Sequence, residues 1–217
     1  MLTKIGLVDD HVITRKGIKT LLELNKQYKV VLEASTGKEL LKLLKNPENL
    51  PDLLIMDLSM PDLDGYATIS ETAKLYPATK ILIFSLYQAE DAVLNGISRG
   101  ASGYLHKSVD PDLLLVAVNA IMTYGFYFNE QIKKRIQIAK SPKSSTGFHG
   151  KQRLTEKELE FIRLASSNLT YKDIAAQMKV QPKTLENYRD STFQKLGINN
   201  RAALTLYAMQ NGIVHLL

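Results

Sequence analysis

The sequence contains no cysteine among its 217 residues, so disulfide bonds and thiolate metal sites are both excluded. This absence fits a reducing compartment. No apolar run approaches the roughly 20 residues that a membrane-spanning helix needs. The start, Met1–Ile5, lacks the basic and apolar regions of a signal peptide. We therefore expect a cytoplasmic protein with no membrane partner.

Acidic and basic residues are unevenly distributed, although the formal net charge is only +6. Residues 1–130 contain 13 Lys/Arg and 16 Asp/Glu, whereas residues 131–153 contain seven Lys/Arg and no Asp/Glu. Residues 154–217 contain eight basic and six acidic residues. An acidic front and a basic rear indicate a polyanionic partner for the rear part only. A basic run of this kind can also be a solvated linker.

The front half alternates strand-like and helix-like patterns. Short apolar or β-branched runs predict five strands, at residues 4–9, 30–34, 53–57, 80–85 and 103–106. The last helix is expected over residues 110–124, because Asp110 and Pro111 offer an N-cap followed by proline at the first helical position. Five alternating units of strand and helix predict an α/β domain with a doubly wound, five-stranded parallel sheet.

Acidic residues stand where two of these strands end. Asp9 and Asp10 follow the run Ile5–Val8, and Asp57 follows Leu53–Met56. Because the carboxyl ends of parallel strands meet at one edge of a sheet, these carboxylates are expected to converge. Carboxylates that lie close together repel one another and favour a divalent cation between them, and Mg²⁺ prefers oxygen ligands. Taken alone, Asp57 could equally be a turn or capping aspartate.

Ser85 and Lys107 stand at the ends of the fourth and fifth predicted strands, and Tyr104 lies within the fifth. With Mg²⁺ bound, Asp57 can act as a nucleophile toward a phosphoryl group and form an acyl phosphate. Mg²⁺ and the Lys107 ammonium would neutralise charge on the phosphoryl oxygens. The Ser85 hydroxyl could donate to one of these oxygens, and Tyr104 could swing in or out as Ser85 moves.

The rear part, residues 154–217, has an all-helical pattern. Thr155 and Glu158 form a capping box before one helix, and Thr170 begins a short helix that ends near Met178. A tight turn follows, and Pro182 begins a longer helix that Gly197 ends. A short helix, a tight turn and a longer helix with a polar, basic face predict a helix-turn-helix. An arbitrary small helical bundle is the other interpretation.

Taken together, these residues resemble those of known families. The front half resembles the receiver domain of two-component response regulators, through Asp9–Asp10, Asp57, Met60–Pro61, Asp64–Gly65, Ser85, Tyr104 and Lys107. The rear part resembles the LuxR-type DNA-binding domain, through Leu154–Glu158, Lys172–Ala175, Lys183–Tyr188 and Lys195–Arg201. The whole chain is thus similar to the NarL/FixJ family of transcriptional regulators. The resemblance implies a flavodoxin-like receiver domain at 1–125, a helix and flexible basic linker at 126–150, and a smaller all-α domain at 151–217.

The resemblance also implies a role for each front-half residue. Asp57 would accept phosphate from a sensor histidine kinase. Asp10 and Asp57, with the backbone carbonyl of Ser59, would hold Mg²⁺, and Asp9 would act directly or through water. Ser85 and Tyr104 would form the switch pair, with Lys107 as the counter-charge of the phosphate. No enzymatic activity is implied beyond phosphorylation and dephosphorylation of the chain's own aspartate.

The rear domain would bind a double-stranded DNA operator, with the chain forming a homodimer when phosphorylated. The helix at 183–196 is expected in the major groove. Its candidate DNA contacts are Lys183, Thr184, Glu186, Asn187, Tyr188, Arg189 and Lys195. Glu186 and Asp190 place acids near DNA, where they either repel phosphates or accept a hydrogen bond from a cytosine amino group.

Two alternative functions remain open at the level of sequence. A metal-dependent phosphohydrolase of the haloacid-dehalogenase kind also uses an aspartate nucleophile at a strand end, but it needs a second Asp where Ser59 stands. A DNA-binding or interaction module that is never phosphorylated would usually lack Asp57, Asp10 or Lys107, and all three are present.

Overall fold

A computed structural model of the chain describes residues 2–60, 64–86, 90–129, 132 and 154–214. Contacts divide the chain into two compact units, Met1–Met122 and Thr123–Leu217.

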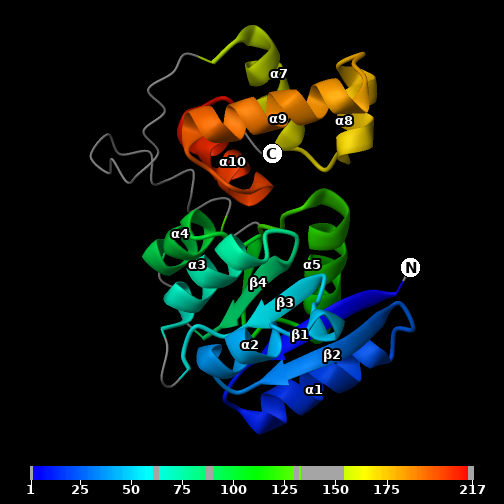
Figure 1. Cartoon of the computed structure of the whole chain (residues 1–217), viewed down its shortest axis with the longest axis vertical. Coiled ribbons are helices and arrows are strands. Elements are labelled where there is room, and N and C mark those ends of the chain that lie inside the picture. The colour runs from blue at the N-terminus through cyan, green and yellow to red at the C-terminus, as the bar shows by residue number, and fades with distance from the viewer. Residues whose placement is uncertain (1, 61–63, 87–89, 130–131, 133–153, 215–217) are drawn as a thin grey trace. The chain divides into compact units, whose positions relative to one another are not determined.

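The first unit contains a five-stranded sheet in which every pair of neighbouring strands is parallel. The strands are β1 (Thr3–Val8), β2 (Tyr28–Ala34), β3 (Leu53–Met56), β4 (Lys80–Ser85) and β5 (Gly103–His106). Their order across the sheet is β2-β1-β3-β4-β5, and Figure 1 shows helices flanking the sheet on either side. The predicted doubly wound parallel sheet is therefore confirmed.

Burial explains why the central strands read as unbroken apolar runs. All four residues of β3 are buried, and Lys80 is the only residue of β4 that is not. Strands covered by helices on both faces cannot alternate apolar and polar residues. The outer strand β2 does alternate, since Lys29, Val31 and Glu33 are less buried than their neighbours.

The helices of the first unit are α1 (Val12–Glu23), α2 (Gly37–Leu43), α3 (Gly65–Leu75), α4 (Glu90–Ser98) and α5 (Pro111–Tyr124), with a short 3₁₀ helix, η1 (Pro47–Asn49). Capping residues set several of their starts. Thr36 caps α2, and Asp64 caps α3 by accepting a hydrogen bond from Tyr66 N. Asp110 accepts from Asp112 N in front of α5, so the predicted cap before Pro111 is present.

Among its described residues, the second unit contains four helices: α7 (Glu156–Ala165), α8 (Tyr171–Gln177), α9 (Pro182–Leu196) and α10 (Arg201–Gln210). The predicted capping box of Thr155 and Glu158 is present, and Thr170 and Asp173 form a second one in front of α8. Helix α9 begins at Pro182 and ends at Gly197, whose φ of 65° is the left-handed conformation that glycine adopts most readily. Helix α7 contacts α8, α9 and α10, and α8 contacts α9.

The predicted helix and linker at 126–150 fall mostly outside the described residues. Phe126 and Phe128 are described and are buried, with their ring centroids 5.6 Å apart.

Candidate functional site

Strand register brings the predicted acidic residues together. Strands β1 and β3 are neighbours with Val8 opposite Met56, so Asp9 and Asp57 leave the sheet side by side. The backbone N–H of Asp57 donates to the carbonyl of Val8 at 2.9 Å, and both carboxylates are almost fully buried. Asp9, Asp10, His11 and Asp57 each offer a ligand atom, and these atoms all lie within 4.8 Å of one another.

Lys107 connects the two buried carboxylates. Its ammonium lies 2.6 Å from Asp57 Oδ2 and 2.7 Å from Asp9 Oδ2. Burial opposes the charged form of Lys107, but hydrogen bonds to Asp57 and Asp9 outweigh that cost and raise its pKa. The backbone N–H of Lys107 donates to the carbonyl of Ser85 at 2.9 Å, which fixes the end of β5 against the end of β4. The positive charge of Lys107 is thus held next to the carboxylate of Asp57, where it would stabilise added negative charge on an oxygen there.

The side chains of Ser85 and Tyr104 are both buried, with exposed fractions of 0% and 3%. Neither hydroxyl has a hydrogen-bond partner among the described residues. Burial raises the pKa of Tyr104 to about 12, with smaller contributions from Tyr66 and Asp57. A buried hydroxyl without a partner is costly, and a phosphoryl oxygen bound at Asp57 is the kind of acceptor that Ser85 lacks.

The loop after β3 is shaped by a close approach between Gly65 and Leu58. A Cβ added at Gly65 would lie 2.7 Å from Leu58 Cα and 2.8 Å from its carbonyl oxygen, so only glycine fits without a shift of backbone. Ser59 N lies 3.2 Å from Asp57 Oδ1 and donates to it. Residues 61–63, which include Pro61, lie outside the described part of the chain.

The carboxylate cluster has the donors that a divalent cation requires. Asp10 Oδ1 is buried and has no hydrogen-bond partner among the described residues; His11 Nδ1 lies 2.8 Å away, but not in hydrogen-bonding geometry. An unpartnered carboxylate oxygen beside Asp9 and Asp57 suits a hard cation. The residues present therefore fit a Mg²⁺ ion held by Asp10 and Asp57, with Asp9 beside them.

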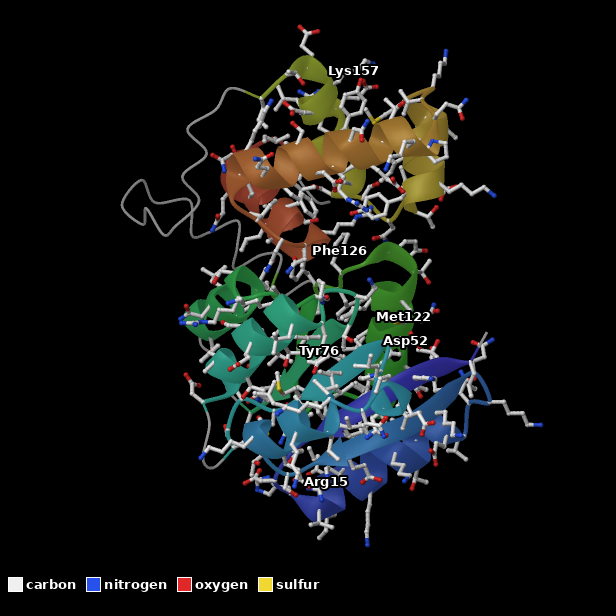
Figure 2. The ribbon with its side chains drawn as sticks, in the orientation of Figure 1. Arg15, Asp52, Tyr76, Met122, Phe126 and Lys157 are labelled. Atoms are coloured by element: carbon white, nitrogen blue, oxygen red, sulfur yellow. The ribbon has the colours of Figure 1, made fainter. Side chains whose placement is uncertain are left out.

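Arg15 is a pocket residue that the sequence reasoning did not identify. Its side chain extends from α1 (Figure 2), where Nη1 donates to the backbone carbonyl of Asp9 and Nε lies 3.9 Å from Glu33 Oε2. The guanidinium thereby supports the backbone that carries Asp9 and Asp10. Because Arg15 bonds a backbone carbonyl and not an acidic side chain, the sequence shows no charge pair that would identify it. The only indication in the sequence is that Arg15 lies about one turn into α1, shortly after Asp9 and Asp10.

Helices α8 and α9 form the predicted helix-turn-helix. The turn between them places Lys179 at a φ of 55°, and Val180 N donates to the carbonyl of Ala175. On α9 the side chains of Leu185, Thr192 and Leu196 are buried. The exposed residues of α9 after its first position are Lys183, Glu186, Asn187, Asp190 and Gln194.

The seven candidate DNA contacts differ in how exposed their side chains are. Lys183, Glu186 and Asn187 are exposed, while Thr184, Tyr188 and Arg189 are half-buried beside them. Lys195 instead pairs with Glu158 at 2.8 Å, and its side chain is only 19% exposed. Burial opposes ionisation of Glu158, but hydrogen bonds from Lys195, Thr155 and Ser191 lower its pKa to about 2. Lys195 therefore connects α9 to α7.

Together, the parallel sheet with its acidic pocket and the separate helix-turn-helix define a DNA-binding regulator with a receiver domain. Two family models match: "Response regulator receiver domain" at residues 5–119, and "Bacterial regulatory proteins, luxR family" at residues 152–208. The chain belongs to the NarL/FixJ family of two-component response regulators. It is a DNA-binding transcriptional regulator, as the resemblance predicted.

Curated relatives align over almost the whole chain. The transcriptional regulatory protein YdfI of Bacillus subtilis is 32% identical, with 98% of each chain covered. The oxygen regulatory protein NreC of Staphylococcus haemolyticus is 31% identical, covering 97% of this chain and 99% of its own. Among solved structures, RcsB of Salmonella typhimurium has a TM-score of 0.59 at 25% identity, covering 95% of this chain and 97% of its own. An RcsB–DNA complex also scores 0.59 at 25% identity, covering 97% and 99%.

Among the helices of the described residues, none combines the length and the apolar character needed to cross a membrane.

Proposed function

We propose that Asp57 accepts a phosphoryl group from a sensor histidine kinase, and that this modification controls dimerisation and DNA binding. The observation that carries the proposal is the position of Lys107, 2.6 Å from Asp57 and 2.7 Å from Asp9. Its backbone N–H bonds the carbonyl of Ser85, whose buried hydroxyl has no partner among the described residues. The pocket supplies a nucleophile, a fixed positive charge and a hydroxyl without an acceptor. Activity as an enzyme on other substrates is not part of the proposal.

The reaction transfers a phosphoryl group to one carboxylate oxygen of Asp57. That oxygen attacks phosphorus, the bond from phosphorus to the histidine nitrogen of the kinase breaks, and the imidazole leaves with the electron pair. Mg²⁺, held by Asp10, Asp57 and the carbonyl of Ser59, would neutralise part of the negative charge on the phosphoryl oxygens. Lys107 exchanges its bond to Asp57 Oδ2 for one to a phosphoryl oxygen, and Ser85 donates to another.

Phosphorylation changes the charge and the hydrogen bonds of the pocket, and both changes can move a two-state equilibrium. Phosphorylation adds roughly one negative charge relative to the carboxylate. Shifting the population from 1:99 to 99:1 requires about 5.5 kcal/mol of differential stabilisation. A hydrogen bond to a charged group contributes about 1.5–3 kcal/mol, so the new bond from Ser85 supplies part of this difference. Lys107 already pairs with Asp57, so it adds only the difference between its old bond and its new one. Tyr104 is buried on β5 opposite Ile83, two residues before Ser85 on β4, and would fill the space that Ser85 leaves as it moves toward the phosphate.

Dimerisation is the proposed link to DNA. The rear domain has eight basic and six acidic residues, which gives a single copy little attraction for phosphates. Two copies place two recognition helices about one turn of DNA apart and double the contacts. We therefore expect the isolated fragment 150–217 to bind DNA weakly and without any requirement for phosphorylation.

A beryllofluoride mimic of the phosphoryl group, added with Mg²⁺, tests the proposal. The dimer fraction in sedimentation velocity and the affinity for promoter DNA in gel shifts should both rise, and Asp57→Asn should show neither change. Identical curves with and without the mimic would mean that Asp57 does not control DNA binding. Repeated release of phosphate from unrelated esters would instead favour a phosphohydrolase.

A further inference from the structure

The exposed side of α9 is poor in positive charge for a helix that enters the major groove. Of its exposed residues, Lys183 is basic, Glu186 and Asp190 are acidic, and Asn187 and Gln194 are neutral. Lys183 pairs with Glu186 at 2.9 Å, which cancels both charges. Asp190 therefore needs a separate explanation, because an acid here would repel the phosphates on either side of the groove.

Asp190 is paired in a way that leaves half of its carboxylate available. Arg189 Nε and Nη2 lie 2.9 and 2.8 Å from the same oxygen, Oδ1. Within the described residues, Oδ2 has no hydrogen-bond partner. The guanidinium neutralises the negative charge, so the free oxygen can approach DNA with less repulsion. What remains is a hydrogen-bond acceptor on the exposed side of the helix.

Arg189 is itself held in place by Tyr171, the first residue of α8. Its guanidinium carbon lies 5.9 Å from the centroid of the Tyr171 ring. That ring stacks on Phe161 at 6.4 Å, and the guanidinium of Arg201 lies 5.1 Å from it. Arg201 is 4% exposed and donates to the carbonyls of Ala165 and Ser167, at 2.5 and 2.9 Å. Residues from all four helices thus fix the ring on which Arg189 rests.

We infer that Asp190 reads a cytosine in the major groove, by accepting a hydrogen bond from the N4 amino group on Oδ2. Carboxylates accept hydrogen bonds from this amino group. Thymine presents an acceptor at the same place in the groove, so a C·G to T·A replacement removes the donor that Asp190 would need. Tyr171 is a positioning residue that acts through Arg189, because fixing the guanidinium fixes the carboxylate. This inference depends on the proposed entry of α9 into the major groove.

The experiment uses the full chain treated with beryllofluoride and a library of randomised duplex DNA. Selection with the unsubstituted chain should enrich one cytosine in each half-site. Replacing that C·G pair by T·A should weaken binding by roughly 5- to 150-fold. For Asp190→Ala the same replacement should change binding by less than about twofold. A cytosine preference that is retained in Asp190→Ala would overturn the inference.

Tyr171 variants test the positioning role. Tyr171→Phe keeps the ring and should keep the preference for cytosine, whereas Tyr171→Leu should reduce that preference. In a chain that already has Asp190→Ala, adding Tyr171→Leu should cause no further loss of preference. A purely structural role would lower the melting temperature and weaken binding to all sequences equally, without changing the ratio between C·G and T·A sites. That equal loss would overturn the positioning role.

A matched ion pair on another helix provides the control. Lys157, labelled in Figure 2, pairs with Glu160 on α7 at 2.8 Å, and Glu160→Ala should leave the cytosine preference unchanged. Failure of the underlying proposal has a different signature. If Lys183→Ala and Arg189→Ala both leave affinity and salt dependence unchanged, α9 does not enter the groove at all. If those variants weaken binding while Asp190→Ala keeps its preference, only the role of Asp190 is wrong.

Discussion

Lys107 Nζ lies 2.6 Å from Asp57 Oδ2, so the proposed nucleophile is held in an ion pair before any phosphoryl group arrives. The same ammonium lies 2.7 Å from Asp9 Oδ2. One positive charge therefore partly neutralises two buried acids. This relationship leads to the first two expectations below.

Asp57→Asn should abolish labelling by acetyl phosphate while the fold is preserved, because the two side chains are nearly isosteric. Mass spectrometry of the intact chain measures the added phosphate. Asp52→Asn is the matched control: Asp52 precedes β3, whereas Asp57 follows it, and Asp52 accepts a bond from Lys4 N at 2.8 Å (Figure 2). The control should be labelled normally; acid-labile phosphate on Asp57→Asn would contradict the assignment.

Lys107→Ala should bind Mg²⁺ more tightly and yet lose the response of dimerisation to beryllofluoride. Removing a positive charge near the cation removes repulsion on the order of ~4 kcal/mol for each unit charge of the cation at about 4 Å, so a gain of at least about tenfold in affinity is expected. Isothermal calorimetry measures the affinity. Lys29→Ala, an exposed position on β2, should change neither property. A weaker affinity for Mg²⁺ in Lys107→Ala would show that this lysine does not compete with the cation.

Gly65→Ala should destabilise the front domain by about 1–3 kcal/mol, since the new methyl group collides with the backbone of Leu58. The displaced loop adjoins Asp57, so the rate of labelling should fall as well. Urea denaturation measures the stability. Gly17→Ala in α1 is the control, because a Cβ there meets no atom within 4 Å and should stabilise the helix by roughly 0.5–1 kcal/mol. Equal effects of the two substitutions would rule out the steric explanation.

The ion pair of Glu158 and Lys195 should make the rear domain sensitive to acid. The folded pKa of Glu158, about 2, lies below its ordinary value of 4.5. A depressed pKa contributes stability above pH 4.5, and this contribution is lost as the pH falls toward 2. The shift corresponds to about 3 kcal/mol, which Glu158→Gln should remove at pH 7.

Hydrogen exchange of the amides in α7 and α9, measured in the full chain, checks this expectation. The difference between Glu158→Gln and the unsubstituted chain should be largest at pH 7, fall to roughly half or less by about pH 3, and vanish only below about pH 2. Glu160→Gln, on the same helix but in an exposed pair with Lys157, should show no such dependence. A difference that stays constant with pH would mean that the charge of Glu158 does not stabilise the domain.

The order of secondary structure was readable from the sequence because the local signals were strong. Buried strands such as Leu53–Met56 are continuous apolar runs, and the caps at Thr155 and Asp110 lie next to the helices that they begin. Asp9 and Asp57 could also be placed together, since parallel strands end at one edge of a sheet. These inferences need only local pattern and one topological rule.

Tertiary structure decided what sequence spacing could not. Lys195 remains a predicted DNA contact, but its pairing with Glu158, 37 residues away in the sequence, exists only because α9 lies on α7. Arg15 donates to the backbone carbonyl of Asp9, and since every residue has such a carbonyl, the sequence does not indicate this bond. Arg189, with Asp190 beside it, is placed by the Tyr171 ring because residues from four helices meet around that ring. The sequence alone determined which residues could carry charge or cap a helix; the packing of distant elements decided which of those charges are paired, buried or left free to bind.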